Sequence, residues 1–239
     1  MRRVRWAELV GAFMLLTRLP VSRLARGQPA MGACIWAYPL VGLIVGGIGA
    51  SVFWLCARLG LSPMLSAVWA VCATVLATGG LHEDGLADTA DGFGGGDTVT
   101  RKLEIMRDSR IGSFGALALL LSLTLRIVAI ADSTDPVFAL LLAGALGRGA
   151  VVVVLLALRP ARREGMAASL GMTPGVPAVA GMVIALLCGL AAWPALLSAS
   201  TVAVGMAALI RQQIGGYTGD VLGATEQVAE CAVLTALLI

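Results

Sequence analysis

Apolar blocks about twenty residues long, separated by short charged segments, constrain this chain more than any other feature of its sequence. The first full block covers residues 35–57, and roughly 20 apolar residues is the length that an α-helix needs to cross a bilayer core. The 239 residues are 59% hydrophobic and 13% charged, whereas soluble domains are about half apolar and about a quarter charged. Because so little polar surface is available to face water, we predict an all-α, polytopic membrane helix bundle that forms a single integral-membrane domain over residues 1–239.

The apolar blocks predict about six to seven transmembrane helices and one N-terminal helix at the membrane surface. Residues 6–20 are too short and too interrupted by Glu8 and Arg18 to span. We expect them to form an interfacial helix, with Arg2, Arg3, Arg5 and Arg18 directed towards lipid headgroups. The expected spans are residues 35–57, 63–79, 113–131, 137–158 and 177–197, a short or re-entrant sixth at 198–210, and a seventh at 228–239 that stops early.

The basic residues indicate which side of the membrane each connecting segment occupies. They are concentrated in the N-terminus, residues 100–112, residues 159–163 and Arg211, and the 132–136 turn contains none. Alternating the spans from a cytoplasmic N-terminus puts every basic segment on the cytoplasmic side, as the positive-inside rule requires. The same alternation puts the two glycine-rich acidic segments, 79–112 and 212–230, on that side. We therefore expect an active site on the cytoplasmic face of the cell's inner membrane.

The most polar part of the chain is the glycine-flanked acidic segment at residues 79–96. Asp84, Asp88 and Asp91 are four and three residues apart, so a helix would stack their carboxylates on one face. Three like charges repel one another, but a bound divalent cation reverses that effect, and Mg²⁺ takes oxygen ligands that it often shares with substrate phosphates. A solvated acidic loop is the alternative. The stacking and the glycine flanks favour a metal site.

Two further groups of polar residues could act together with this acidic segment. Arg107 and Arg110 flank Asp108 just before the third span, and paired guanidiniums grip phosphate well. The alternative is that they are positive-inside arginines with a local ion pair. Asp220 and Glu230 follow a glycine turn. Asp220 could serve only as a helix N-cap, whereas a carboxylate at membrane depth, such as Glu230, must be paired or metal-bound.

Two arginines and the single histidine complete the candidates. Arg148 lies near the middle of the fourth span, where an ionisable residue indicates function by default, and its expected partners are the carboxylates or a substrate phosphate. Arg126 is close enough to a span end to reach the interface. His82 alone cannot form a zinc site, and a structural role is expected. Carboxylates, arginines and a membrane site together suit phosphoryl or phosphodiester transfer.

Four motifs closely resemble those of the adenosylcobinamide-GDP ribazoletransferase (cobalamin 5′-phosphate synthase) family. They are GGLHEDGLADTADG at residues 79–92, TRLP at 17–20, IMRDSRIGSFG at 105–115 and GYTGDVLGA at 216–224. The resemblance covers essentially the whole chain. It implies a late enzyme of cobalamin (vitamin B12) biosynthesis, which transfers the adenosylcobinamide-phosphate group of adenosylcobinamide-GDP to α-ribazole or its 5′-phosphate and releases GMP.

The resemblance also implies Mg²⁺ as cofactor and suggests roles for the candidate residues. The expected catalytic or metal-binding carboxylates are Asp84, Asp88, Asp91, Asp108 and Asp220, with Glu230 as a further metal ligand. The expected phosphate-binding residues are Arg107, Arg110, Arg148, Gly216 and Thr218.

Two other classes of protein remain alternatives. A CDP-alcohol phosphotransferase would share the Asp-x-x-Asp-Gly opening at residues 88–92, but the Ala-Arg that should follow is missing. An ion-coupled transporter could use Arg148 and Glu230, but such proteins usually contain inverted repeats, and no repeat is evident. The lipid bilayer is the expected environment. The scattered basic residues give no sign of nucleic-acid binding, and a homo-oligomer is compatible with the small-residue spacing Gly42-x-x-x-Gly46.

Overall fold

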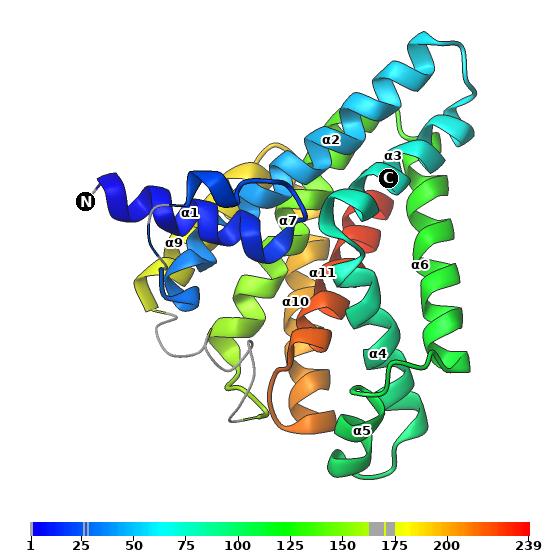
Figure 1. Cartoon of the computed structure of the whole chain (residues 1–239). Helices are drawn as coiled ribbons and strands as arrows, with labels where there is room; N and C mark the ends of the chain where they lie inside the picture. The colour runs from blue at the N-terminus through cyan, green and yellow to red at the C-terminus, as the bar shows by residue number, and fades with distance from the viewer. Residues whose placement is uncertain (1, 26, 28, 163–169, 171–174) are drawn as a thin grey trace.

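The computed structural model describes residues 2–25, 27, 29–162, 170 and 175–239 (Figure 1). Every regular element in this part of the chain is helical, and the only β pairing within it is an isolated bridge between Pro160 and Tyr217. The prediction of an all-α fold is therefore confirmed. Two arginines of the basic segments, Arg26 and Arg163, lie outside the described residues.

Within the described residues, most neighbouring helices are joined by short connections. In chain order they are α1 (Arg2–Leu16), η1 (Ser22–Leu24), η2 (Met31–Ala37), α2 (Tyr38–Arg58), α3 (Pro63–Thr78), α4 (Leu81–Gly95), α5 (Val99–Ile105), α6 (Ser113–Asp132), α7 (Pro136–Ala157), α9 (Gly175–Gly189), α10 (Trp193–Ile214) and α11 (Gly219–Ala236).

Fewer helices qualify as membrane spans than the sequence predicted. Among the described residues four helices are long and apolar enough, namely Met31–Arg58, Ser113–Asp132, Pro136–Ala157 and Trp193–Ile214. A fifth is added if α3 and α4, which meet at 89°, together form one broken span. The described residues thus contain four to five candidate spans where six to seven were expected, and the chain is a polytopic helical membrane protein, as predicted.

The count differs because two helix boundaries lie elsewhere than expected. Trp193 and Pro194 open α10 instead of closing the fifth span, because proline fits the first turn of a helix, where its missing N–H is not needed. As a result α9 has only 15 residues, and the expected short sixth span is part of the 22-residue α10. The expected seventh span is the end of α11, which begins at Gly219 and buries Glu226 and Gln227.

The centre of the bundle is α7, against which α2 packs very closely (Figure 1). A Cβ added at Gly42 would overlap the carbonyl oxygen of Gly144, and one added at Gly46 would overlap that of Leu140. The two backbones can touch only because these positions have no side chain. The Gly42-x-x-x-Gly46 spacing therefore serves a contact inside one chain and gives no support for a homo-oligomer.

The sharp turn between α3 and α4 directs the acidic helix along α11 and α6 (Figure 1). Gly79 and Gly80 both have a φ of +70°, the left-handed conformation that only glycine adopts without strain. Gly79 also closes α3 by donating its N–H to the carbonyl oxygen of Leu76, a common helix ending. Two consecutive glycines are thus what allows a helix of carboxylates to follow an apolar one at once.

Candidate functional site

The acidic segment is helical, and two of its three aspartates face a cavity. Asp84 and Asp88 line a cavity of about 1050 Å³, together with Arg18 and Ser109. Asp84 is exposed and Asp88 partly exposed. The cavity thereby brings together three of the four motifs found in the sequence, at residues 17–20, 79–92 and 105–115.

The third aspartate of the stack, Asp91, has a different environment. Its side chain is buried, and its carboxylate accepts the N–H groups of Gly112 at 2.7 Å and Gly115 at 2.8 Å. These N–H groups belong to the first turn of α6 and the residue before it, where a carboxylate satisfies unpaired donors and the helix dipole favours negative charge. Asp91 therefore fixes the start of α6 against α4.

The fourth motif reaches the same place through a close contact between α4 and α11. A Cβ added at Gly85 would lie 2.6 Å from the backbone oxygen of Asp220, and one added at Gly223 would lie 3.2 Å from the Cα of His82. Because both positions are glycine, the helices approach until the carboxylates of Asp84, Asp88 and Asp220 interact electrostatically.

The sequence left open whether Asp220 serves only as a helix N-cap, and it is not the N-cap of α11. Thr218 caps α11, since its Oγ1 accepts the N–H of Val221, and Thr218 also donates to the Asp220 carboxylate at 3.1 Å. Burial raises the pKa of Asp220, and the nearby Asp84 raises it further, against the opposing effects of Thr218 and Arg162. Gly216 is buried against the carbonyl oxygen of Arg159.

The carboxylate oxygens of Asp84, Asp88 and Asp220 suit a hard divalent cation. Within the described residues no arginine or lysine forms an ion pair with Asp84, Asp88 or Asp220. Among the described residues, no three His, Cys, Asp or Glu side chains lie close enough together to enclose a metal ion. Mg²⁺ does not require such a cage, because it is usually bound by one or two carboxylates together with substrate phosphates and water. The residues therefore fit Mg²⁺ at an open site.

The arginines of the 105–115 motif do not line the cavity. Arg110 and Asp108 are exposed and partly exposed, and they pair with each other at 2.6 Å. Hydrogen bonds from Arg110 lower the pKa of Asp108 to about 2. Arg107 is exposed and lies near Arg162, which the sequence did not single out. Arg162 donates to the carbonyl oxygen of Leu103 at 2.8 Å and lies near Asp220.

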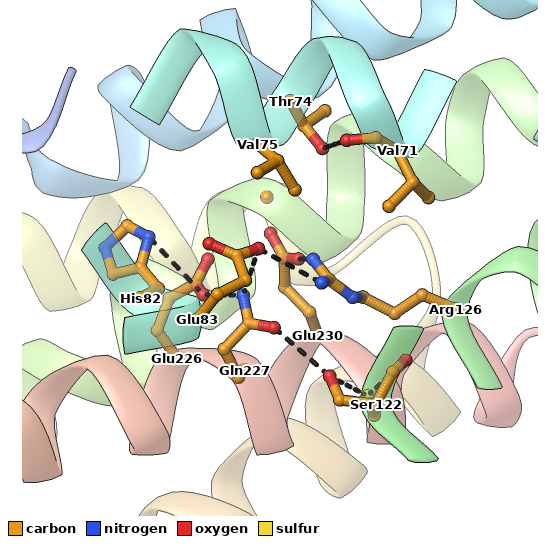
Figure 2. A network of polar contacts seen from close by, with 12 residues as sticks. Val71, Thr74, Val75, His82, Glu83, Ser122, Arg126, Glu226, Gln227 and Glu230 are labelled. Atoms are coloured by element: carbon orange, nitrogen blue, oxygen red, sulfur yellow. Dashed lines mark hydrogen bonds and ion pairs between the residues drawn. The ribbon is translucent and has the colours of Figure 1, made fainter. Parts of the chain in front are cut away.

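A buried network of ion pairs lies beside the site (Figure 2). Arg126 on α6 donates to Glu83 at 3.0 Å and to Glu230 at 3.3 Å, and its side chain is only 3% exposed. The sequence analysis allowed Arg126 to reach the membrane interface, but the side chain is buried and does not do so. Glu83 precedes the cavity-lining Asp84, so this pair ties α4 to α6 and α11.

The second guanidinium of the network is Arg148 on α7. It donates to Glu230 at 2.8 Å and pairs with Glu226, while its other amino nitrogen lies 3.5 Å from His82 Nδ1. Burial of a charge is costly unless the charge is paired. One carboxylate oxygen of Glu230 accepts from Arg148 and the other accepts from Arg126. Glu230 and Arg148 therefore lie in the network and not on the cavity wall.

The sequence did not identify two further members of the network. Gln227 donates to Glu83 at 3.2 Å and to Glu226 at 2.9 Å, and it accepts from Ser122 at 3.1 Å (Figure 2). Glu83 and Gln227 could have been noticed as polar residues on otherwise apolar helix faces, but nothing in the sequence indicates that they meet.

Together, the candidate spans and the carboxylate-lined cavity define a polytopic helical membrane protein with an acidic site. The family model described as cobalamin-5-phosphate synthase matches residues 8–238. The chain belongs to this family, as the four motifs indicated.

Individual relatives agree with this assignment. The chain is 46% identical to the adenosylcobinamide-GDP ribazoletransferase of Mesorhizobium japonicum, over 92% of this chain and 88% of that protein. It is 45% identical to the protein of the same name from Bradyrhizobium diazoefficiens, over 95% of this chain and 92% of that protein. No solved structure matches it. These relatives are named as ribazoletransferases, and neither is named as a CDP-alcohol phosphotransferase or a transporter, the two alternatives considered above.

Proposed function

We propose that this chain is an adenosylcobinamide-GDP ribazoletransferase. It would transfer the adenosylcobinamide-phosphate group of adenosylcobinamide-GDP to α-ribazole or α-ribazole 5′-phosphate, with GMP as the leaving group. Family membership and the names of the relatives support this activity. The observation that carries the proposal is the approach of Asp220 on α11 to Asp84 and Asp88 on α4, beside a cavity of about 1050 Å³.

Asp84, Asp88 and Asp220 are the residues that would hold Mg²⁺. A bound Mg²⁺ neutralises charge on a transferring phosphate. Asp91, Asp108 and Glu230 have other partners in the described chain, namely two N–H groups of the α6 start, Arg110, and two guanidiniums. We therefore assign these three carboxylates to supporting the site and not to binding the metal.

The remaining work of the site is positioning and proton transfer. The ribazole hydroxyl attacks the phosphorus attached to the cobinamide arm, a new P–O bond forms, and the P–O bond to GMP breaks with its electron pair on the GMP oxygen. The hydroxyl proton must pass to a nearby base.

We further propose that this site opens to the cytoplasm from the inner membrane. Three of the basic segments meet at one end of the bundle: Arg162 donates to Leu103, Lys102 to Gln213, and Tyr217 to Arg159. Clustering of basic connections at one end is what the positive-inside rule requires of a cytoplasmic face.

The experiment that tests the function uses the full chain purified into lipid nanodiscs. The protein is incubated with adenosylcobinamide-GDP, α-ribazole 5′-phosphate and Mg²⁺, and both GMP and the cobalamin phosphate product are measured. We expect equal amounts of both products and little GMP without acceptor. Release of GMP without acceptor would indicate a hydrolase, and absence of both products from folded protein would refute the proposal.

A further inference from the structure

The charged side chains around the cavity are mostly acidic, although the proposed site must receive phosphates. Its wall carries the carboxylates of Glu83, Asp84 and Asp88. Among the described residues that line it, Arg18 has the only cationic side chain. A phosphate approaching this wall would be repelled by the carboxylates unless a cation faced it.

The backbone at Arg18 is anchored to the turn that precedes the acidic helix. Its N–H donates to the carbonyl oxygen of Ala77, near the end of α3, at 2.7 Å. Just before it, Thr17 closes α1, since both its N–H and its Oγ1 donate to the carbonyl oxygen of Phe13. The segment that carries Arg18 is therefore fixed to α3 and does not trail freely from α1.

The side chain of Arg18 passes directly over Gly79. A Cβ added at Gly79 would lie 2.6 Å from both Cγ and Nε of Arg18. Because Gly79 has no side chain, the guanidinium can extend along the turn to the wall that also contains Asp84 and Asp88. Arg18 is exposed, and no ion pair with it is present within the described residues.

The same wall is apolar next to Arg18. Gly11, Met14, Leu15 and Arg18 all line the cavity, and their spacing of three, four and seven residues is that of one helix face continued past the end of α1. A ligand whose phosphate meets Arg18 would thus have its organic part against Met14 and Leu15.

We propose that Arg18 is a substrate-binding residue that pairs with a phosphate group of a substrate in this cavity. This inference rests on the proposed function. It replaces the expectation that Arg18 faces lipid headgroups, and it gives the cavity the cation that Arg107, Arg110 and Arg148 do not supply there. The phosphate belongs either to the acceptor, α-ribazole 5′-phosphate, or to the diphosphate of the donor.

The test compares Arg18→Gln and Arg18→Lys with the wild type in the assay of GMP release. A hydrogen-bonded charge pair of this kind changes binding on the order of 10- to 100-fold, so we expect Arg18→Gln to raise one KM by that factor and Arg18→Lys to restore part of it. Arg23→Gln is the matched control, because Arg23 in η1 is exposed and does not line the cavity; its KM values should equal those of the wild type.

The two phosphate sources are distinguished by varying one substrate at a time. If Arg18 binds the acceptor phosphate, Arg18→Gln raises the KM for α-ribazole 5′-phosphate but leaves that for unphosphorylated α-ribazole unchanged. If Arg18 binds the donor diphosphate, the KM for adenosylcobinamide-GDP rises with either acceptor. Unchanged KM values for all substrates would overturn the inference, and an inactive wild type would instead contradict the proposed function.

Two neighbouring glycines provide a second test, in which Arg18 itself is not substituted. Gly79 and Gly80 both have a φ of +70°, but a Cβ at Gly80 would meet nothing within 4 Å. Gly79→Ala and Gly80→Ala therefore carry similar backbone strain, and only the first displaces Arg18. We expect the KM affected in Arg18→Gln to rise further in Gly79→Ala than in Gly80→Ala. Equal KM values in the two variants would count against the placement of Arg18.

Discussion

Gly85 on α4 lies directly against the backbone of Asp220 on α11, so that a Cβ at Gly85 would be 2.6 Å from the Asp220 oxygen. Two parts of the chain more than a hundred residues apart thereby present their carboxylates to one place. The acidic site depends on this contact, because one methyl group would force the two helices apart.

Gly85→Ala should therefore lower kcat/KM strongly, although it adds only one methyl group. The added methyl group meets backbone atoms of Asp220 and Gly223, which cannot move aside as a flexible side chain can. A displacement of about 1 Å in a catalytic group can cost on the order of 100-fold in rate, and we expect a loss of that size in kcat/KM. Gly219→Ala, next to Asp220 on α11, is the control, since its Cβ would meet nothing within 4 Å. Equal kcat/KM in the two variants would argue against a required close contact.

Gly42→Ala should destabilise the bundle. Its Cβ would overlap the carbonyl oxygen of Gly144 on α7 and lie 2.7 Å from Cδ of Arg148, and overpacking of this kind typically costs about 1–3 kcal/mol. Gly47→Ala on the same helix makes only an ordinary 3.6 Å contact with Leu141. Thermal unfolding in detergent should show a lower Tm for Gly42→Ala alone, and a Tm equal to that of Gly47→Ala would contradict the packing of α2 on α7.

Arg126→Gln should be strongly destabilising because it leaves Glu83 without its ion pair and removes one partner of Glu230. Breaking a buried pair by removing one partner costs about 3–5 kcal/mol. Adding Glu83→Gln removes the orphaned charge, so the double variant should regain part of the lost Tm. A double variant less stable than Arg126→Gln would show that the network does not act through charge balance.

The exposed pair of Asp108 and Arg110 gives a prediction about pH. Arg110 lowers the pKa of Asp108 to about 2, below the ordinary value of about 3.9. The stability that this pair contributes is therefore fully present above about pH 4, and it is lost as the pH falls towards 2. Asp108 stays ionised throughout the neutral range. Arg110→Gln should return its pKa towards the ordinary value, as measured by NMR titration of the carboxyl carbon, and an unchanged pKa would contradict the pairing.

Local spacing predicted the helix of carboxylates but not the direction in which each one points. The three- and four-residue intervals between Asp84, Asp88 and Asp91 fit a helix, with a solvated loop as the alternative, and the structure shows that the segment is helical. The partners of Asp91 are N–H groups 21 and 24 residues further on, and periodicity within one helix carries no information about such contacts.

Partners distant in the sequence explain the other differences as well. Arg126 pairs with residues 43 and 104 positions away, so the sequence could offer only the local alternative of reaching the interface. Arg18 looks like an interfacial arginine until the turn at Gly79 brings it to the cavity. By contrast, the all-helical fold depends on hydropathy alone, and it could be predicted with no knowledge of these contacts.

The most direct test of the central claim is to measure binding of Mn²⁺, as a spectroscopic substitute for Mg²⁺, to the purified chain by electron paramagnetic resonance. The wild type is compared with Asp84→Asn on α4, Asp220→Asn on α11 and the control Asp97→Asn, which is exposed and lies beyond the C-terminal end of α4. We predict one Mn²⁺ site per chain, weakened at least tenfold by either Asp84→Asn or Asp220→Asn and unchanged in the control. Wild-type affinity in either of those two variants would contradict a site shared between the two helices.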